Sequence, residues 1–308
     1  MKRRDFFKGA ATASVGLILF PRDAMSVNVN KTNECCTHKI MTCNIRVALP
    51  QDEEKGLGWN ARKKLTAKVI KQQNPDIICL QEVIKVQMDD MRNYFSEFAS
   101  FGFEGPEMDP FPVGYHLIAK NPIMFSKEKY ELLTGGTYWL SETPLIGGSK
   151  SWGTARARNV SWVRLKEKQS GKEFRIINTH LDHISQEARE AQIKMILNEG
   201  DQYLDDFPQL LAGDFNTGAN NKVLKMTEEK GWKDTYTAIH GSVDPGFTYH
   251  GFKGAKYNGK TQGNQKNSRI DFILSRGLIE TKGAKIIKDS DGDFYPSDHY
   301  FVSTEVEL

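Results

Sequence analysis

A carboxylate and an amide follow a short apolar run in the segment Leu210-Leu211-Ala212-Gly213-Asp214-Phe215-Asn216. Residues i and i+2 of a β-strand point to the same side, so Asp214 and Asn216 can face one spot at the end of a buried strand. A carboxylate that accepts a proton, beside an amide that holds an oxygen atom, suits the activation of a water molecule. Because Gly, Asp and Asn are also turn formers, this segment taken alone favours a turn.

The same pattern of an apolar run followed by polar side chains recurs along the chain. Side chains that could bind a metal ion or a phosphate occur at Asn44, Gln81-Glu82, Asn178 and His180, Asp271, and Asp298-His299. Each place taken singly is explained as well by a solvated strand end, a turn or a cap. Several carboxylates buried at one cleft would be costly without a partner. The full set therefore predicts a hard cation that binds them.

The elements expected to hold these residues alternate between strands and helices. Strands are predicted at 39–46, 76–82, 115–119, 121–125, 137–140, 159–166, 174–178, 209–212, 269–274, 283–288 and 300–307, and helices at 59–73, 86–99, 185–204 and 220–230. Residues 240–268 are rich in Gly, Lys, Asn and Gln and predict a long exposed loop. This rhythm favours one layered α/β domain over residues 39–308.

Residues 1–25 resemble an export signal. The charged segment Lys2–Lys8 precedes an apolar segment, Gly9–Phe20, and then Pro21, which is typical of a signal with a cleavage zone. The paired arginines Arg3 and Arg4 resemble a twin-arginine signal. A membrane anchor and a disordered basic tail are the alternatives, and the short apolar segment makes an anchor the weaker one. We expect export to the periplasm or the medium, with residues 26–38 loose.

The same segment accounts for the charge of the chain. Its five basic and two acidic residues supply the whole formal charge of +3, so residues 26–308 are close to neutral. Proteins that hold long nucleic acids without sequence preference usually carry a basic excess. The charge therefore favours a small or local phosphate substrate. The four cysteines fit no zinc pattern, no disulfide is assigned, and Cys43 and Cys79 are expected to be core thiols.

The polar strand ends, in their order along about residues 39–308, resemble the motif set of the deoxyribonuclease I-like endonuclease/exonuclease/phosphatase family. The motifs are Asn44, Gln81-Glu82, Asn178-Thr179-His180-Leu181, Gly213-Asp214-Phe215-Asn216, Arg269-Ile270-Asp271 and Ser297-Asp298-His299. Residues 139–144 and 178–183 further resemble an uncharacterised bacterial branch. The resemblance implies an α/β (α+β type) fold, a four-layer α/β sandwich with two central mixed sheets flanked by helices. It also implies a phosphoesterase that uses Mg²⁺, with Mn²⁺ able to replace it.

The resemblance implies roles for the metal and the water. Glu82 is expected to be the principal Mg²⁺ ligand, helped by Asn44 and Asp298 directly or through water. Asp214 is expected to orient or deprotonate the attacking water, and Asn216 to hold the scissile phosphate or the metal.

The resemblance also implies contacts with the phosphate. His180 and His299 are expected to stabilise its charge, with Asp271 supporting one of these imidazoles, and Asn178 and Arg158 to bind it. The chain departs from the branch at Lys120, where an acidic residue is usual, and at Phe125, where a tyrosine is usual. Either the substrate pocket beside the metal is therefore expected to differ, or Lys120 is expected to contact a phosphate.

The resulting prediction is an exported, metal-dependent hydrolase that cleaves a phosphodiester or a phosphomonoester by direct attack of an activated water. An endo- or exonuclease is the alternative among enzymes, and a non-catalytic phosphate-binding scaffold is the alternative of another class. The expected partner is a phosphorylated small molecule, a lipid headgroup or a nucleic-acid phosphodiester. We expect no stable membrane span and a monomer.

Overall fold

The computed structural model describes residues 37–103, 118–243, 245–258 and 268–308 of the 308-residue chain. The chain divides into two units, Met1–Glu34 and Cys35–Leu308, and the structural statements below concern the second. The predicted export signal, the predicted loose segment up to residue 36 and residues 115–117 of a predicted strand lie outside the described residues.

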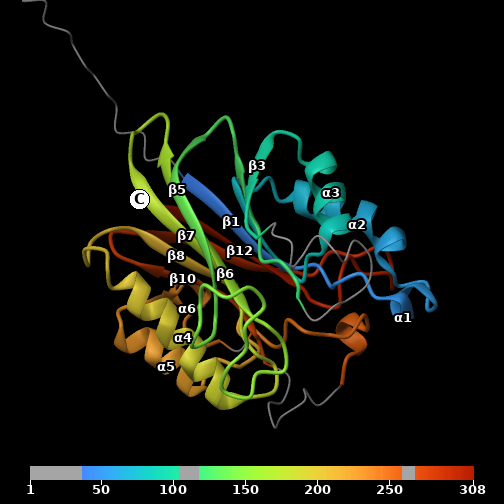
Figure 1. Ribbon diagram of the computed structural model, residues 1–308. Helices are drawn as coiled ribbons and strands as arrows, with labels where there is room; N and C mark the ends of the chain where they lie inside the picture. The colour runs from blue at the N-terminus through green and yellow to red at the C-terminus, as the bar shows by residue number, and fades with distance from the viewer. Residues whose placement is uncertain (1–36, 104–117, 244, 259–267) are drawn as a thin grey trace, which may run out of the picture. The chain divides into compact units, whose positions relative to one another are not determined.

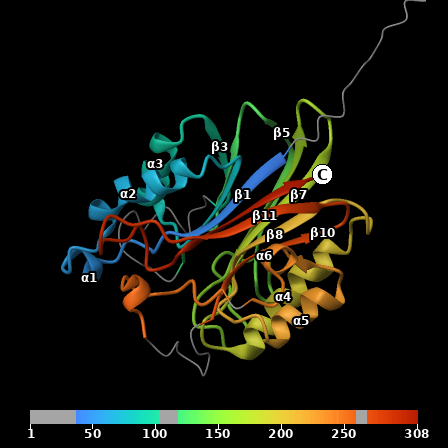
Figure 2. The same ribbon diagram turned by 180° about the vertical axis from the view of Figure 1, so that it is seen from behind.

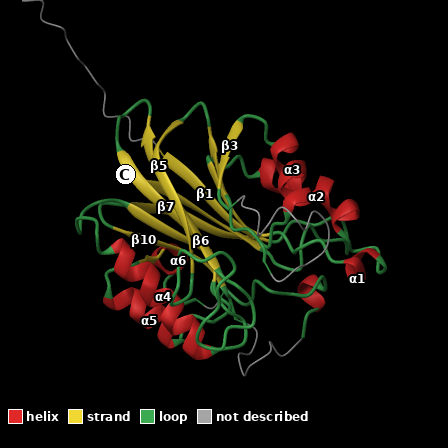
Figure 3. Ribbon diagram, viewed as in Figure 1, coloured by secondary structure: helices red, strands yellow, loops and turns green. Residues whose placement is uncertain are grey.

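Two six-stranded mixed sheets form the centre of this unit (Figures 1 and 3). In the first sheet, β1 and β2 are parallel and the other neighbours are antiparallel. Its order is β11 (Glu280–Ile287), β12 (Phe301–Glu307), β1 (Thr37–Asn44), β2 (Ile77–Gln81), β4 (Ile123–Ser126) and β3 (Phe98–Phe101).

In the second sheet, β7 and β8 are parallel and the other neighbours are antiparallel. Its order is β5 (Tyr130–Trp139), β6 (Asn159–Glu167), β7 (Glu173–His180), β8 (Gln209–Asp214), β10 (Asp271–Arg276) and β9 (Lys233–Asp234).

Helices cover the outer faces of both sheets, as the front and back views show (Figures 1 and 2). The first sheet carries α1 (Pro50–Glu53), α2 (Trp59–Gln72) and α3 (Lys85–Tyr94), and the second carries α4 (Gln186–Gly200) and α5 (Lys222–Glu229). A short helix, α6 (Thr235–His240), lies beside β10 and β11, and a 3₁₀ turn spans Gly254–Lys256. The predicted four-layer sandwich is thereby confirmed.

Alternating side chains on the strands build the three cores between the four layers. Ile40 of β1 faces the second sheet, whereas its neighbour Met41 packs under α2 and α3. On β7, Ile176 joins the core between the sheets, and Ile177 packs against α4 and α5. Successive strand residues point to opposite faces, and both faces are covered here. The strand sequences are therefore continuous apolar runs that end in polar residues.

Two sequence predictions of local structure are wrong. The helix predicted to Ala99 ends at Tyr94, because the backbone leaves the helical conformation at Phe95 and residues 98–101 pair with β4 as a strand. The predicted exposed loop at 240–268 contains Thr248 and His250, which are fully buried. The Thr248 hydroxyl accepts hydrogen bonds from the backbone at the start of β10, so this part of the segment belongs to the core. Residues 259–267 lie outside the described part.

Two further expectations concern thiols and membranes. Cys43 and Cys79 are buried free thiols, as predicted. Among the described residues, no helix has the length and apolar character needed to cross a bilayer.

Candidate active site

Three predicted site residues lie side by side across the second sheet. His180, the last residue of β7, is paired in register with Asp214, the last residue of β8. Asp214 is paired in turn with Asp271, the first residue of β10. These residues are 4%, 1% and 1% exposed, respectively, so they form the floor of the site. Asp271, which was expected inside a strand at 269–274, is thus the first residue of its strand in the structure.

Gly213 allows the strands that carry Asp214 and His180 to approach closely. Its φ is +154°, and a Cβ atom there would lie 2.1 Å from the carbonyl oxygen of Thr179 on the neighbouring strand. Any larger residue would therefore displace one of the two strands. Gly213 is therefore needed within β8, where a side chain would prevent the close pairing that sets the geometry of the site.

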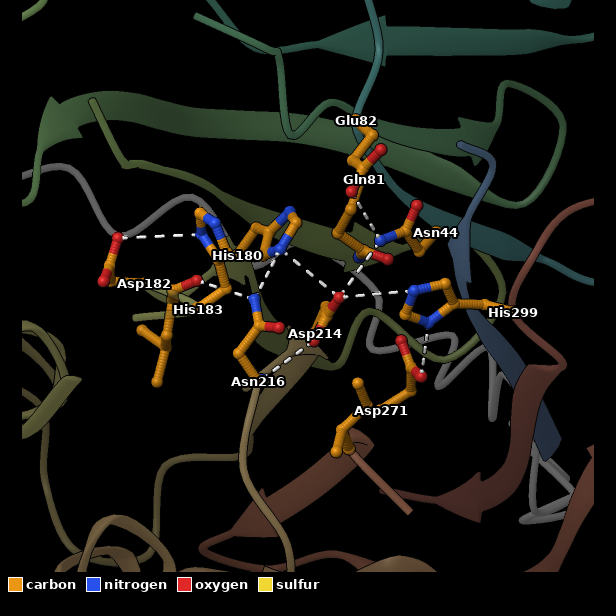
Figure 4. Close-up of polar contacts among 12 residues, drawn as sticks. Asn44, Gln81, Glu82, His180, Asp182, His183, Asp214, Asn216, Asp271 and His299 are labelled. Atoms are coloured by element: carbon orange, nitrogen blue, oxygen red, sulfur yellow. Dashed lines mark hydrogen bonds and ion pairs between the residues drawn. The ribbon is translucent and has the colours of Figure 1, made fainter. Parts of the chain in front are cut away.

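A chain of charged groups runs through Asp271, His299 and Asp214 (Figure 4). The His299 Nδ1 atom lies 2.9 Å from Asp271 Oδ2, and its Nε2 atom lies 3.8 Å from Asp214 Oδ2. Burial opposes a charged ring, but Asp271 and then Asp214 raise the pKa of His299 to about 10. Burial, followed by the charge of Asp271, raises the pKa of Asp214 to about 7. An imidazolium therefore lies beside a carboxylate that can exchange a proton near neutral pH.

On its other side, Asp214 contacts His180 and Asn216. The His180 Nε2 atom lies 3.3 Å from Asp214 Oδ2 and 2.8 Å from the side-chain nitrogen of Asn216. Asn216 has a φ of +50°, so the chain leaves the strand there and the side chain folds back to reach His180. Burial, followed by the charge of Arg158, lowers the pKa of His180 well below its usual value. Near neutral pH, His299 is therefore positively charged and His180 is neutral.

The first sheet contributes Asn44 and Glu82 to the same place. Asn44 ends β1 and donates its amide to Glu82 Oε1 at 3.2 Å and to Asp214 Oδ2 at 3.0 Å. This second bond joins the two sheets through side chains 170 residues apart in the sequence. Glu82 follows β2 with a φ of +62°, an unusual conformation for a residue other than glycine. Its side chain is turned toward Asn44 and accepts a hydrogen bond from the Val47 amide.

Asp298 lies beside Arg46, a residue that the sequence interpretation missed. The Arg46 guanidinium is 3.4 Å from Asp298 Oδ2 and also pairs with Asp52. Burial raises the pKa of Asp298 despite this neighbour. The spacing of Arg46 two residues after Asn44 could have indicated a side chain on the same side of the strand end. Tyr249 was missed as well, because its ring, 5.2 Å from that of His299, comes from the predicted loop.

Asn178 is drawn into the contact between the sheets. Its amide nitrogen donates to the carbonyl oxygens of Leu80 and Pro122, and its oxygen accepts from Gln81. The side chain is fully buried. These bonds give Asn178 a bridging position beneath the site, and its contact with a phosphate stays a prediction.

Arg158 lies just before β6, next to His180 and His183. One guanidinium nitrogen, Nη2, is 3.4 Å from His183 Nδ1. No ion pair joins Arg158 to a carboxylate within the described part, and its Nε atom is buried without a partner. A buried cation of this kind can accept an anionic ligand, which is compatible with the predicted phosphate contact. Figure 4 shows His183 on the side of His180 away from His299.

Two sets of side chains could hold a metal ion. The ligand atoms of Asp214, Asp271 and His299 lie within 4.8 Å of one another. The carboxylates of Asp271 and Asp214 raise the pKa of His299, so a metal ion bound there would have to displace the proton of the imidazolium. The predicted set of Glu82, Asp298 and Asn44 offers only oxygen atoms, which Mg²⁺ prefers. Glu82 forms no ion pair of its own among the described residues, so the donor set fits a hard divalent cation.

Comparisons with known proteins agree with this architecture. The family model described as "Endonuclease/Exonuclease/phosphatase family" matches residues 25–299. Among curated proteins, an uncharacterized protein of Acanthamoeba polyphaga mimivirus is 31% identical over 165 residues, which cover 52% of this chain. The match spans 59% of the viral protein's own length.

Among solved structures, an endonuclease/exonuclease/phosphatase from Bacteroides vulgatus is 28% identical, with a TM-score of 0.76. The alignment covers 89% of this chain and 99% of that one. A mannosyl-6-phosphatase from Bacteroides thetaiotaomicron VPI-5482 is 26% identical with the same TM-score, and the alignment covers 88% of this chain and 100% of that one.

We expect Gly213→Ala to destabilise the unit by more than about 2 kcal/mol, because the new methyl group would overlap the backbone of Thr179. Urea unfolding monitored by circular dichroism measures this change. Gly231→Ala is the matched control, since Gly231 also has a positive φ (+78°) but open space around it, and should cost only about 1 kcal/mol. Equal losses in the two variants would show that strand approach is not the constraint.

Proposed function

Because the chain belongs to the endonuclease/exonuclease/phosphatase family, we propose that it hydrolyses a phosphoric ester with an activated water, using a divalent cation bound at Glu82. The family assignment confirms the predicted enzyme class at the level of the family. The finer proposal is supported above all by one observation. Asp214 is buried between an amide of the first sheet, Asn44, and two imidazoles of opposite charge state.

Glu82 and Asp298, with Asn44, would hold the cation, which when bound neutralises phosphate charge and favours the leaving oxygen. Mg²⁺ is the proposed ion, and Mn²⁺ could replace it because both take oxygen ligands. Arg46, already paired with Asp298, would hold that carboxylate in place. The identity of the ion is thus proposed from the chemistry of the donors.

The remaining side chains would handle the water and the phosphate. Asp214 would take a proton from the water at Oδ2. Asn44 donates a hydrogen bond to the same oxygen and so orients the carboxylate. The His299 imidazolium, held by Asp271, faces the negative charge that develops on the phosphate. Asn216 and His180 flank Asp214 on the side away from His299, and Arg158 adds a positive charge beyond them. Phosphoryl transfer needs such placement and charge compensation more than covalent chemistry.

The substrate proposed is a phosphorylated small molecule or headgroup, cleaved at a monoester or diester bond. The near-neutral charge of residues 26–308 supports this class over a long nucleic acid. The monomer expected from the sequence stays a prediction.

We expect Asp214→Asn to lower kcat/KM by about 100-fold to 10,000-fold, because an amide cannot accept the proton. The assay compares an aryl phosphate monoester, a bis-aryl phosphodiester and duplex DNA, each with Mg²⁺ and with EDTA, on residues 26–308. Asp205→Asn, at a carboxylate that is 99% exposed, is the control. A wild type as inert as the variant on all three and on a panel of phosphorylated metabolites would instead favour a phosphate-binding scaffold.

The pH dependence of kcat/KM should follow the ionisation of Asp214. This carboxylate accepts a proton only when ionised, and its pKa is raised to about 7. Activity should therefore increase as the pH rises, and it should fall as the pH drops below that value. A bound cation favours the ionised form, so at saturating Mg²⁺ the midpoint should lie at or below 7. A rate that decreases as the pH rises from 5 to 7 would exclude Asp214 as the base.

We further propose that residues 1–25 direct export to the periplasm or the medium, as their twin-arginine pattern indicates. Fractionation of cells that produce the full chain should place the protein outside the cytoplasm. The double substitution Arg3→Lys and Arg4→Lys should retain it inside. A cytoplasmic wild type would contradict the proposal.

A further inference from the structure

Arg62 is a fully buried arginine of α2 that has no carboxylate partner among the described residues. Its guanidinium donates only to backbone carbonyl oxygens. Nη1 reaches Ile45 at 2.9 Å and Pro296 at 2.8 Å, Nη2 reaches Arg46 at 3.2 Å, and Nε reaches Leu57 at 2.6 Å. Four carbonyls from three separate stretches of chain therefore meet at one side chain.

Two of these stretches carry the proposed site. Residues 45–46 directly follow Asn44, and Pro296 directly precedes the Ser297-Asp298-His299 motif. The strands concerned, β1 and β12, are neighbours in the first sheet. The Ser297 hydroxyl also donates to the Asn44 carbonyl at 2.6 Å, so the two turns touch directly. Arg62 lies at the junction where the spacing between Asn44 and Asp298 is set.

Two aromatic rings lie next to the Arg62 guanidinium. The guanidinium carbon lies 5.7 Å from the centre of the Trp59 ring and 5.3 Å from that of Phe252. Burying a charge is unfavourable unless its hydrogen bonds are all met. An apolar side chain could fill this space against α2, but it would leave the Ile45 carbonyl without its donor. The Pro296 carbonyl would keep only the Thr66 hydroxyl, at 2.8 Å, and would lose its link to residues 45–46 through Arg62.

We propose that Arg62 is a positioning residue for the reaction. It joins the turn after Asn44 to the turn before Asp298 and so sets the spacing of the cation-binding oxygens. This inference rests on the proposed function. Arg62 touches neither cation nor substrate and acts through the backbone of residues 45, 46 and 296. A lysine cannot replace it, because one ammonium group lacks the planar array of donors that reaches separate carbonyls.

The test compares Arg62→Lys and Arg62→Ala with the wild type. Outer residues that orient metal ligands typically change affinity or activity by about 10-fold to 100-fold. We expect both variants to bind Mn²⁺ more weakly by that factor in calorimetry. kcat on the best phosphoester should fall by a similar factor, with little change in KM. Guanidinium ion, at concentrations too low to denature, should restore part of both losses in Arg62→Ala only.

Arg175→Lys is the matched control. Arg175 is also fully buried, stacks on Trp162 and contacts Glu199, but it lies near the start of β7, at the opposite end of the strand from His180. It should lower the melting temperature without changing Mn²⁺ affinity. If Arg62→Lys behaves in the same way, with lost stability and unchanged Mn²⁺ affinity, Arg62 is merely structural and the proposal is wrong.

A readout free of metal and substrate separates this inference from the proposed function. Hydrogen exchange should show faster exchange of amides 45–48 and 297–299 together in Arg62→Lys, and not in Arg175→Lys. If the wild type neither binds Mn²⁺ nor cleaves any phosphoester, the proposed function fails. Faster exchange in both turns would then still support the junction, and unchanged exchange in either turn would overturn it.

Discussion

The hydrogen bond from Asn44 to Asp214 is the contact on which the site depends. It joins the end of a strand in one sheet to the end of a strand in the other, and it does so through a buried carboxylate. A carboxylate in that position is unfavourable unless its oxygens are satisfied. The amide, two imidazoles and the backbone of Asn216 meet that requirement together. The residues from the two sheets consequently form one site only when the sheets are correctly packed.

Much of the framework beneath the site serves to keep the two sheets in register. Asn178 bonds across the gap to the backbone of β2 and of the turn before β4, and Gln81 bonds back to Asn178. Gly213 lets two parallel strands approach at the level of Asp214. These hydrogen bonds and this close backbone approach lie at the end of an otherwise apolar core. They direct specific pairs of atoms toward each other, which apolar packing alone does less sharply.

The sequence predicted a layered α/β fold, most strands and the set of polar strand ends, because apolar periodicity and strand termini are local features. The four-layer arrangement was implied by the family resemblance. The sequence could not show which strand ends meet, since that depends on pairing between distant segments. It therefore missed Arg46, which lies beside Asp298 only after folding, and Tyr249, whose Gly-rich and Lys-rich surroundings indicated a loop. The helix predicted past Tyr94 failed for a related reason: an edge strand pairs with β4 where the local spacing of Phe95 and Phe98 suits a helix.

The two core thiols have a consequence for the handling of the chain outside a reducing compartment. Cys43 packs under the helices that cover the first sheet, whereas Cys79 faces the second sheet. Burial raises the pKa of both thiols, so neither forms much thiolate. They lie on neighbouring strands, β1 and β2, and point to opposite faces of the sheet. In the folded unit, Cys43 and Cys79 are therefore not placed to form a disulfide with each other.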